Sequence, residues 1–179
     1  MLFRSFIGNY SSGKMGFALA EACAERGAEV TLVAGPVSLK THHPAIKRID
    51  VESAGEMYQA AITAFPSSDA AILCAAVADY RPENASGQKI KRETEGEMTL
   101  HLVPNPDIAA SLGAIKREGQ VMVGFALETN DEATHAEGKL KRKNLDFIVL
   151  NSLRDQGAGF RCDTNKITII DNADRKSVV

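Results

Sequence analysis

The sequence predicts an α/β fold with a doubly wound, mainly parallel sheet in a single domain. Apolar segments of strand character alternate with segments of helical periodicity along nearly the whole chain, without a repeat or a linker. The segment 69–77 is apolar almost throughout, as expected of a central strand that is covered on both faces. A length of 179 residues is sufficient for one core without a metal or disulfide.

The predicted elements follow one another in a regular order. Ser11 or Ser12 can cap a first helix, which would end near Gly27 and carry Met15, Leu19, Ala22 and Cys23 on one face. A second helix would begin with a capping box at Ser53 and end near Pro66. Two more helices are expected at 107–117 and 131–143, and strands at 29–33, 46–51, 69–77, 98–103, 121–125, 147–150 and 166–171. This layout is Rossmann-like, and such sheets bind ligands at the carboxyl ends of their strands.

Composition argues against several classes of partner. The formal net charge is −2 with 25% charged residues, which gives no indication of a nucleic-acid or membrane partner. The three cysteines, Cys23, Cys74 and Cys162, are far apart and odd in number, which is typical of a reducing compartment. The first residues are too short for a signal peptide, and no apolar run approaches the length of a membrane span. We therefore expect a cytoplasmic protein.

The densest glycine and hydroxyl cluster, residues 8–16, runs directly into the first helix. Free amides at a helix start attract phosphate, so the cluster is either a phosphate site or a structural turn with a cap. Met15 stands where a P-loop requires Ser or Thr, which argues against a P-loop nucleotidase. The next strand is followed by Gly35 and Pro36, with no carboxylate to hold a nicotinamide ribose, which argues against a dehydrogenase.

Other candidate residues have both a functional and a structural interpretation. Asp79 follows a buried strand and could bind a ribose hydroxyl or a metal ion, or simply end a turn. Lys89 belongs to a cationic run of a long polar loop; such runs are usually solvated, unless a triphosphate lies nearby. Phe125 follows a glycine on a strand, where it could face a nucleotide base or belong to the core.

The start of the helix predicted at 107–117 and the end of the helix predicted at 131–143 also carry candidate binding residues. Pro106 and Asp107 are favourable at a helix start without any ligand. Lys139 and Lys143 complement a helix C-terminus, and their spacing lets both reach one anion.

Taken together, six blocks resemble the bacterial phosphopantothenoylcysteine synthetase (phosphopantothenate–cysteine ligase) family, commonly the C-terminal half of a bifunctional flavoprotein. The resemblance extends in order over about residues 6–171. The blocks are 9–16, 75–80, 89–91, 105–108, 124–129 and 143–146.

The resemblance implies ligation of cysteine to 4′-phosphopantothenate through an acyl-cytidylate, with CTP as co-substrate, Mg²⁺ as cofactor and a homodimer as the assembly. It implies catalytic roles for Asn9 and Lys89, and substrate contacts by Asn9, Ala75 and Ala76. Asp79 is the candidate metal ligand. The implied nucleotide-binding residues are Ser11, Ser12, Gly13, Leu73, Cys74, Ala75, Asp79, Lys89, Pro106, Asp107, Ile108, Ala109, Phe125, Lys139 and Lys143.

The chain departs from the family pattern at its ends. Ser5 is inserted beside Arg4, and the family usually has a strand before this point and a helix beyond Val179. We therefore expect residues 1–179 to be one ligase domain without those two elements. The alternatives are a nicotinamide-dependent reductase and a non-catalytic nucleotide-binding fragment, and the sequence leaves the choice of CTP or ATP open.

Overall fold

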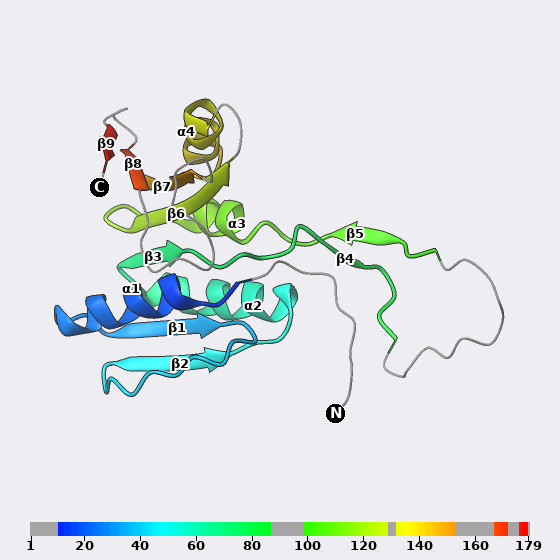
Figure 1. Ribbon diagram of the computed structural model, residues 1–179, viewed down its shortest axis with the longest axis horizontal. Helices are drawn as coiled ribbons and strands as arrows, with labels where there is room; N and C mark the ends of the chain where they lie inside the picture. Colours follow the sequence, from blue (N-terminus) through cyan, green and yellow to red (C-terminus); the bar gives the residue numbers. More distant parts are fainter. Residues whose placement is uncertain (1–10, 87–98, 129–131, 153–166, 172–175, 179) are drawn as a thin grey trace.

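The computed structural model describes residues 11–86, 99–128, 132–152, 167–171 and 176–178 (Figure 1). The helices are α1 (Lys14–Glu25), α2 (Ala54–Ala64), α3 (Ile108–Ile115) and α4 (Glu132–Arg142), with a 3₁₀ turn η1 (Phe65–Ser67) after α2. The strands are β1 (Val30–Ala34), β2 (Ile46–Asp50), β3 (Ala70–Leu73), β4 (Tyr80–Pro82), β5 (Leu102–Pro104), β6 (Val121–Glu128), β7 (Phe147–Ser152), β8 (Ile167–Asp171) and β9 (Lys176–Val178).

The described strands form three hydrogen-bonded groups. β1 and β2 are parallel, and β3, β6 and β7 are parallel within a five-stranded sheet of order β3-β6-β7-β8-β9. β4 and β5 pair antiparallel in an arm that extends away from the body (Figure 1). The prediction of an α/β, mainly parallel, Rossmann-like fold is confirmed. β8 corresponds to the predicted last strand but runs antiparallel to β7, and β9 was not predicted.

The main core lies on one face of the five-stranded sheet, under α3 and α4. Alternate residues of adjacent strands point to this face, and Met122, Ile148 and Ile170 are fully buried there. Leu112 of α3 and Leu140 of α4 pack against them in the same cluster. Each such side chain contributes roughly 1.5–3 kcal/mol when it is removed from water.

Helix α1 buries a different face from the predicted one. Its buried residues are Phe17, Ala20 and Ala24, whereas Met15 is exposed. Apolar residues occur on both sides of this helix, so periodicity alone could not choose between them. The choice is made by β1 and β2, which α1 contacts, and the Arg48 guanidinium of β2 lies 5.2 Å from the centre of the Phe17 ring.

Strand β3 also differs from its prediction. It is shorter than the predicted segment, and Ile72 is exposed rather than covered. Within the described residues β3 pairs only with β6, and β1 pairs only with β2. Two strand edges are therefore unpaired in that part of the chain, which explains the exposure of Ile72.

A strand added ahead of Met1 is expected to pair with these edges. A short Val- and Ile-rich segment joined by a Gly-containing turn should raise the thermal midpoint and reduce self-association, because unpaired edges promote pairing between molecules. The control is the same segment with a central proline, which cannot donate a ladder hydrogen bond. Calorimetry and solution size compare the three proteins; equal midpoints and equal sizes would contradict the prediction.

A buried glutamine joins the α2–β3 connection to the start of β6. The Gln120 side chain is 6% exposed, and its Nε2 donates to Phe65 O at 2.9 Å and to Ser68 O at 2.6 Å. Its Oε1 accepts from Arg117 N at 2.8 Å. One side chain therefore bonds two backbone groups at η1 and one in the turn before β6. At η1, Pro66 prevents a regular continuation of α2.

Replacing this side chain with an apolar one of similar length tests its role. Gln120→Met should lower the free energy of unfolding by about 3 kcal/mol, because backbone groups lose their partners in a buried place. Gln59→Met, on the exposed side of α2, serves as the matched control and should change stability by less than about 0.5 kcal/mol. Urea unfolding measures both, and similar losses in the two variants would argue against the interpretation.

Candidate functional site

The carboxyl ends of β1 and β3 lie near the start of α1, as expected for a ligand-binding edge in this class of fold (Figure 1). Gly13, the N-cap residue of α1, has φ = 78°, and a Cβ there would lie 3.2 Å from Val37 Cγ1 in the loop after β1. The positive φ favours glycine, and a Cβ would be in tight contact with the Val37 side chain. The prediction that Ser11 or Ser12 caps this helix is wrong, because Gly13 is the N-cap and no side chain caps the helix. The Ser11 and Ser12 hydroxyls instead accept from Gly13 N at 3.3 Å and Lys14 N at 3.4 Å in the turn that leads into it.

The end of β3 contacts α1 directly. A Cβ on Gly16 would lie 3.1 Å from Cys74 Sγ, which places the turn after Leu73 beside the first turn of α1. Burial raises the pKa of the Cys74 thiol, so the thiol stays protonated at neutral pH and packs as a small apolar group. Ala75 is exposed and Ala76 is half-buried at this edge. The predicted nucleotide residue Cys74, in the turn after β3, is thus adjacent to the first turn of α1.

Asn105 anchors the base of the β4–β5 arm. Its Nδ2 donates to Ala78 O at 2.8 Å, and its backbone N–H donates to Asp79 O at 2.7 Å. Its Oδ1 accepts from Arg81 Nη1 at 3.2 Å. The sequence marked Asn105 only as part of a motif, whereas the structure assigns it these bonds. They leave the Asp79 carboxylate exposed between the end of β3 and the arm.

The side chains of the described residues do not form a cluster of metal ligands. No cluster of three or more His, Cys, Asp or Glu side chains occurs in the described ranges in a metal-binding arrangement. The prediction that Asp79 is a metal ligand remains a prediction. In the same ranges, no helix is long and apolar enough to cross a membrane.

Two predicted nucleotide-binding residues, one just before α3 and one just after α4, meet at the start of α3. Asp107 is the N-cap of α3, and its Oδ1 accepts from Ala110 N at 3.0 Å. Lys143, which follows α4, donates through Nζ to Asp107 Oδ2 at 3.0 Å. Pro106 is exposed just before the cap, and Ile108 and Ala109 form the half-buried first turn of α3.

Opposing effects act on the Asp107 carboxyl. Partial burial favours the protonated form, but the hydrogen bonds from Ala110 and Lys143 and the charges of Lys143 and Arg142 outweigh it. The pKa of Asp107 is therefore lowered below its ordinary value. A carboxylate, an ammonium group and the positive end of a helix dipole thus share one location.

The remaining predicted nucleotide residues lie on β6 and α4. Phe125 is half-buried on β6 and pairs with Val149 of β7, on the face opposite Ala126. Lys139 lies in the last turn of α4, and Lys143 N donates to Lys139 O at 3.0 Å, so these two lysines project from the same side as predicted. Asn9 and Lys89 lie outside the described residues, and their catalytic roles remain predictions.

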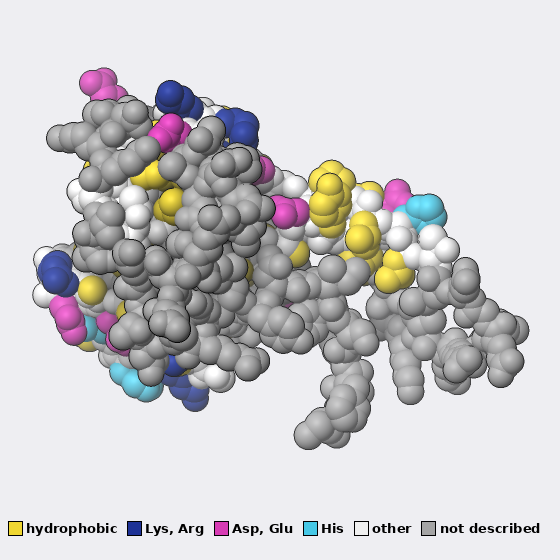
Figure 2. Space-filling model, turned by 45° about the horizontal axis from the view of Figure 1, so that its top comes forward, with side chains coloured by type: hydrophobic (Ala, Val, Ile, Leu, Met, Phe, Trp, Pro, Cys, Tyr) yellow, Lys and Arg dark blue, Asp and Glu magenta, His cyan; other side chains and the backbone are white. Residues whose placement is uncertain are grey.

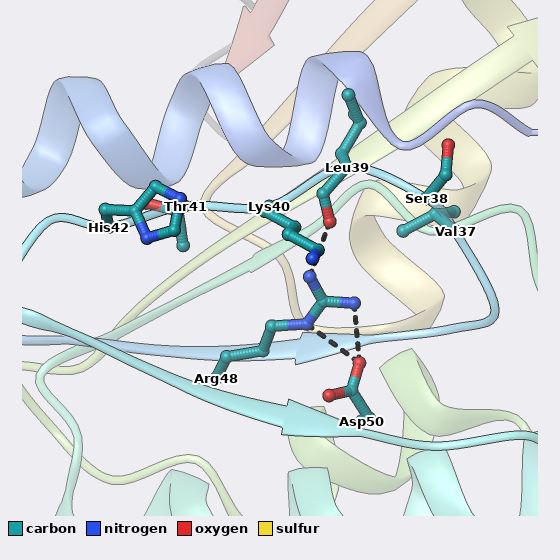
Figure 3. Close-up of a pocket in the computed structure, with 8 residues that line it drawn as sticks. All are labelled: Val37, Ser38, Leu39, Lys40, Thr41, His42, Arg48 and Asp50. Carbon is teal, nitrogen blue, oxygen red and sulfur yellow. Dashed lines mark hydrogen bonds and ion pairs between the residues drawn. The ribbon is translucent and has the colours of Figure 1, made fainter.

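The sequence did not predict an open pocket of about 400 Å³ beside β2 (Figure 3). Arg48 spans it: its Nε and Nη2 bond Asp50 Oδ1 at 2.8 and 2.6 Å, and its Nη1 donates to Leu39 O at 2.5 Å. Arg48 therefore shapes the loop after β1. The residues that line the pocket are Val37, Ser38, Leu39, Lys40, Thr41, His42, Arg48 and Asp50.

Comparisons with known proteins identify the family. Residues 4–179 match the family described as DNA/pantothenate metabolism flavoprotein C-terminal domain. The chain is 51% identical over 165 residues to the coenzyme A biosynthesis bifunctional protein CoaBC of Vibrio parahaemolyticus, covering 92% of this chain and 41% of that protein. It is also 60% identical over 168 residues to a protein named cysteine/cysteine sulfinic acid decarboxylase from an unknown prokaryotic organism, covering 94% of this chain and 46% of that protein.

A solved structure agrees with these matches. The crystal structure of the C-terminal domain of coenzyme A biosynthesis bifunctional protein CoaBC superposes with a TM-score of 0.79 and 35% identity, covering 98% of this chain and 76% of that one. The chain belongs to the DNA/pantothenate metabolism flavoprotein C-terminal domain family, and the resemblance found in the sequence is confirmed. The chain spans less than half the length of the curated relatives named above.

Two substitutions separate the cap of Asp107 from its charge. Asp107→Ala removes both and should lower the free energy of unfolding at pH 7 by about 1 kcal/mol, the usual value of an N-cap. Asp107→Asn keeps an acceptor for Ala110 N–H and should have a smaller effect.

The charge contribution has a defined pH dependence. Because the pKa of Asp107 is lowered from 3.8, the stabilisation by its charge is present above about pH 4 and is lost as the pH falls through the folded-state pKa. The difference between wild type and Asp107→Asn should therefore be larger at pH 7 than at an acidic pH below 3.8, and it should be lost once the pH is below the folded-state pKa. Urea unfolding at both pH values measures it, and an equal difference at both would contradict the assignment.

Proposed function

We propose that this chain ligates cysteine to 4′-phosphopantothenate with CTP in coenzyme A biosynthesis. Membership in the family of CoaBC C-terminal domains is the observation that carries this proposal. The contact of α1 with the turn after β3, at the carboxyl edge of the strands, supports it, because that is where this fold class binds ligands. The decarboxylase name belongs to a protein of which the chain covers 46%, so it does not assign that activity to this segment.

The proposed reaction has two steps without a covalent enzyme intermediate. A carboxylate oxygen of 4′-phosphopantothenate attacks the α-phosphorus of CTP, the bond to the bridging oxygen breaks, and pyrophosphate leaves. The cysteine amine then attacks the acyl carbon of the acyl-cytidylate, CMP leaves, and the amine loses a proton. In this proposal Lys89 neutralises charge in the first step, and Asn9 donates to the acyl oxygen in the second.

The described residues support a nucleotide site at the start of α3. Lys143 and the first-turn amides of α3 offer positive charge to phosphate oxygens. Phe125 and Lys139 would lie at the nucleotide, and Ala75 and Ala76 at the pantothenate portion. Mg²⁺ would screen the triphosphate, held mainly by phosphate oxygens and water with Asp79 as one carboxylate ligand.

The β4–β5 arm supports the proposed homodimer. Tyr80, Leu100 and Leu102 are 55%, 49% and 45% exposed, and Figure 2 shows hydrophobic side chains clustered along this arm. A two-stranded ribbon is marginally stable alone, so pairing with a second copy would cover its apolar side chains. The proposed location is the cytoplasm, where the phosphorylated substrates and the nucleotide are soluble.

A ligation assay with matched variants tests the function. With CTP, 4′-phosphopantothenate and cysteine, the wild type should release pyrophosphate and form 4′-phosphopantothenoylcysteine. Lys89→Gln should lower pyrophosphate release about a hundredfold while CTP still raises the thermal midpoint, because one positioned charge supplies roughly 3 kcal/mol to a transition state. Lys47→Gln, on the exposed side of β2, is the control for loss of a charge.

The same measurements separate the alternatives. Stabilisation by NAD but not by CTP would support a reductase, and stabilisation by CTP without turnover would support a binding fragment. Near-normal pyrophosphate release by Lys89→Gln would exclude the role proposed for Lys89.

A further inference from the structure

The segment after α4 is fixed against α3 by an unusually close backbone contact. A Cβ on Gly113 would lie 2.1 Å from Lys143 O and 3.2 Å from Asn144 Cβ, so only glycine permits the approach. Asn144 has φ = 53° and donates through Nδ2 to Gly113 O at 3.0 Å. Asn144 therefore holds the two helices together with its side chain while it ends α4 with its backbone.

The end of α4 has a complete Schellman motif. Leu145 N donates to Leu140 O at 2.9 Å, and Asn144 N donates to Lys141 O at 3.3 Å. Leu140 and Leu145 are both buried, which supplies the hydrophobic contact that accompanies this motif. Glycine satisfies the left-handed position at least as well as asparagine, so the motif does not explain why the side chain of Asn144 bonds α3.

A buried lysine braces the same segment from the other side. Lys116, whose side chain is 11% exposed, donates to Asp146 Oδ2 at 2.6 Å and to Asn144 O at 3.3 Å. Asp146 Oδ2 also accepts from Met122 N at 2.6 Å. The main chain of 143–146 is therefore held by α3, by the residue that follows α3 and by β6.

This bracing fixes the main chain from which the Lys143 side chain departs. Its ammonium group lies at the start of α3, where the helix dipole is also positive. A cation there does not stabilise the helix; it is favourable only with an anion, which is Asp107 in this structure. Arg142 adds further positive charge at the same carboxylate. The location is thus suited to a more highly charged anion.

We propose that Gly113 and Asn144 are positioning residues that direct the Lys143 ammonium to the start of α3 to receive the phosphate groups of the nucleotide. This inference rests on the proposed function for its ligand, CTP. The position of the ammonium itself does not depend on that function. Asn144 and Gly113 act through Lys143 and do not contact the nucleotide.

Two substitutions test the positioning role. Asn144→Gly keeps the left-handed backbone but removes the Nδ2 bond, and Gly113→Ala forces the main chain of Lys143 away. Both should weaken CTP binding about tenfold, measured by calorimetry, the effect of losing one hydrogen bond to a charged group. The KM for cysteine should stay unchanged. In a Lys143→Gln background, Asn144→Gly should have no further effect, because the two residues act as one unit.

Matched controls exclude a general loss of structure. Gly119→Ala introduces backbone strain at a left-handed glycine outside this contact, with φ = 84° and no atom within 4 Å of the added Cβ. Gly138→Ala adds a methyl group to α4 where nothing lies within 4 Å. Neither substitution should change the affinity for CTP, whatever its effect on the thermal midpoint.

A nucleotide-free measurement separates this inference from the proposed function. The pKa of the Asp107 carboxyl, followed by NMR titration, should rise in Asn144→Gly, Gly113→Ala and Lys143→Gln, and should not change in Gly119→Ala. An unchanged pKa, or unchanged CTP affinity with a lower midpoint, would overturn the positioning role. A wild type that binds no CTP while the pKa responds would overturn the proposed function and support the positioning of the ammonium.

Discussion

The contact between Gly113 and the main chain of Lys143 is the constraint on which the described core and the candidate site both depend. It brings α4 close enough to α3 for Leu112, Leu140 and Leu145 to share one buried cluster over β6 and β7. The same approach sets the point from which the Lys143 side chain departs. The packing of the leucine cluster and the position of the Lys143 charge therefore depend on the same backbone contact.

The link from this contact to the sheet is polar. Asp146 accepts from Met122 N and pairs with Lys116, so the start of β6 and the end of α3 are joined through one carboxylate. Removing one partner of such a pair is costly, because the other charge would remain largely withdrawn from water. Gln120 performs a similar task for η1, because its side chain bonds the carbonyl groups of Phe65 and Ser68 on either side of that turn.

At the candidate ligand-binding edge, small residues and backbone bonds decide the arrangement. Gly13 and Gly16 allow α1 to approach Val37 and Cys74, while Asn105 ties the arm to the turn after β3. Strand β3 carries candidate residues although it is not flanked on both sides within the described ranges. At this edge, α1 is held in place by close contacts with Val37 and Cys74. Strand β3, by contrast, pairs on one side only within the described ranges, whereas the sequence predicted a central strand.

The sequence by itself determined the α/β class, the order of most elements and the capping box at Ser53, because these follow from local periodicity and local hydrogen bonding. It also marked Asp107 and Lys143 as candidates. Only the tertiary structure decided that they form an ion pair, that α1 buries Phe17 rather than Met15, and that Gly113 must be glycine. Each of these depends on distances between elements that are remote in sequence, and local patterns do not encode such distances.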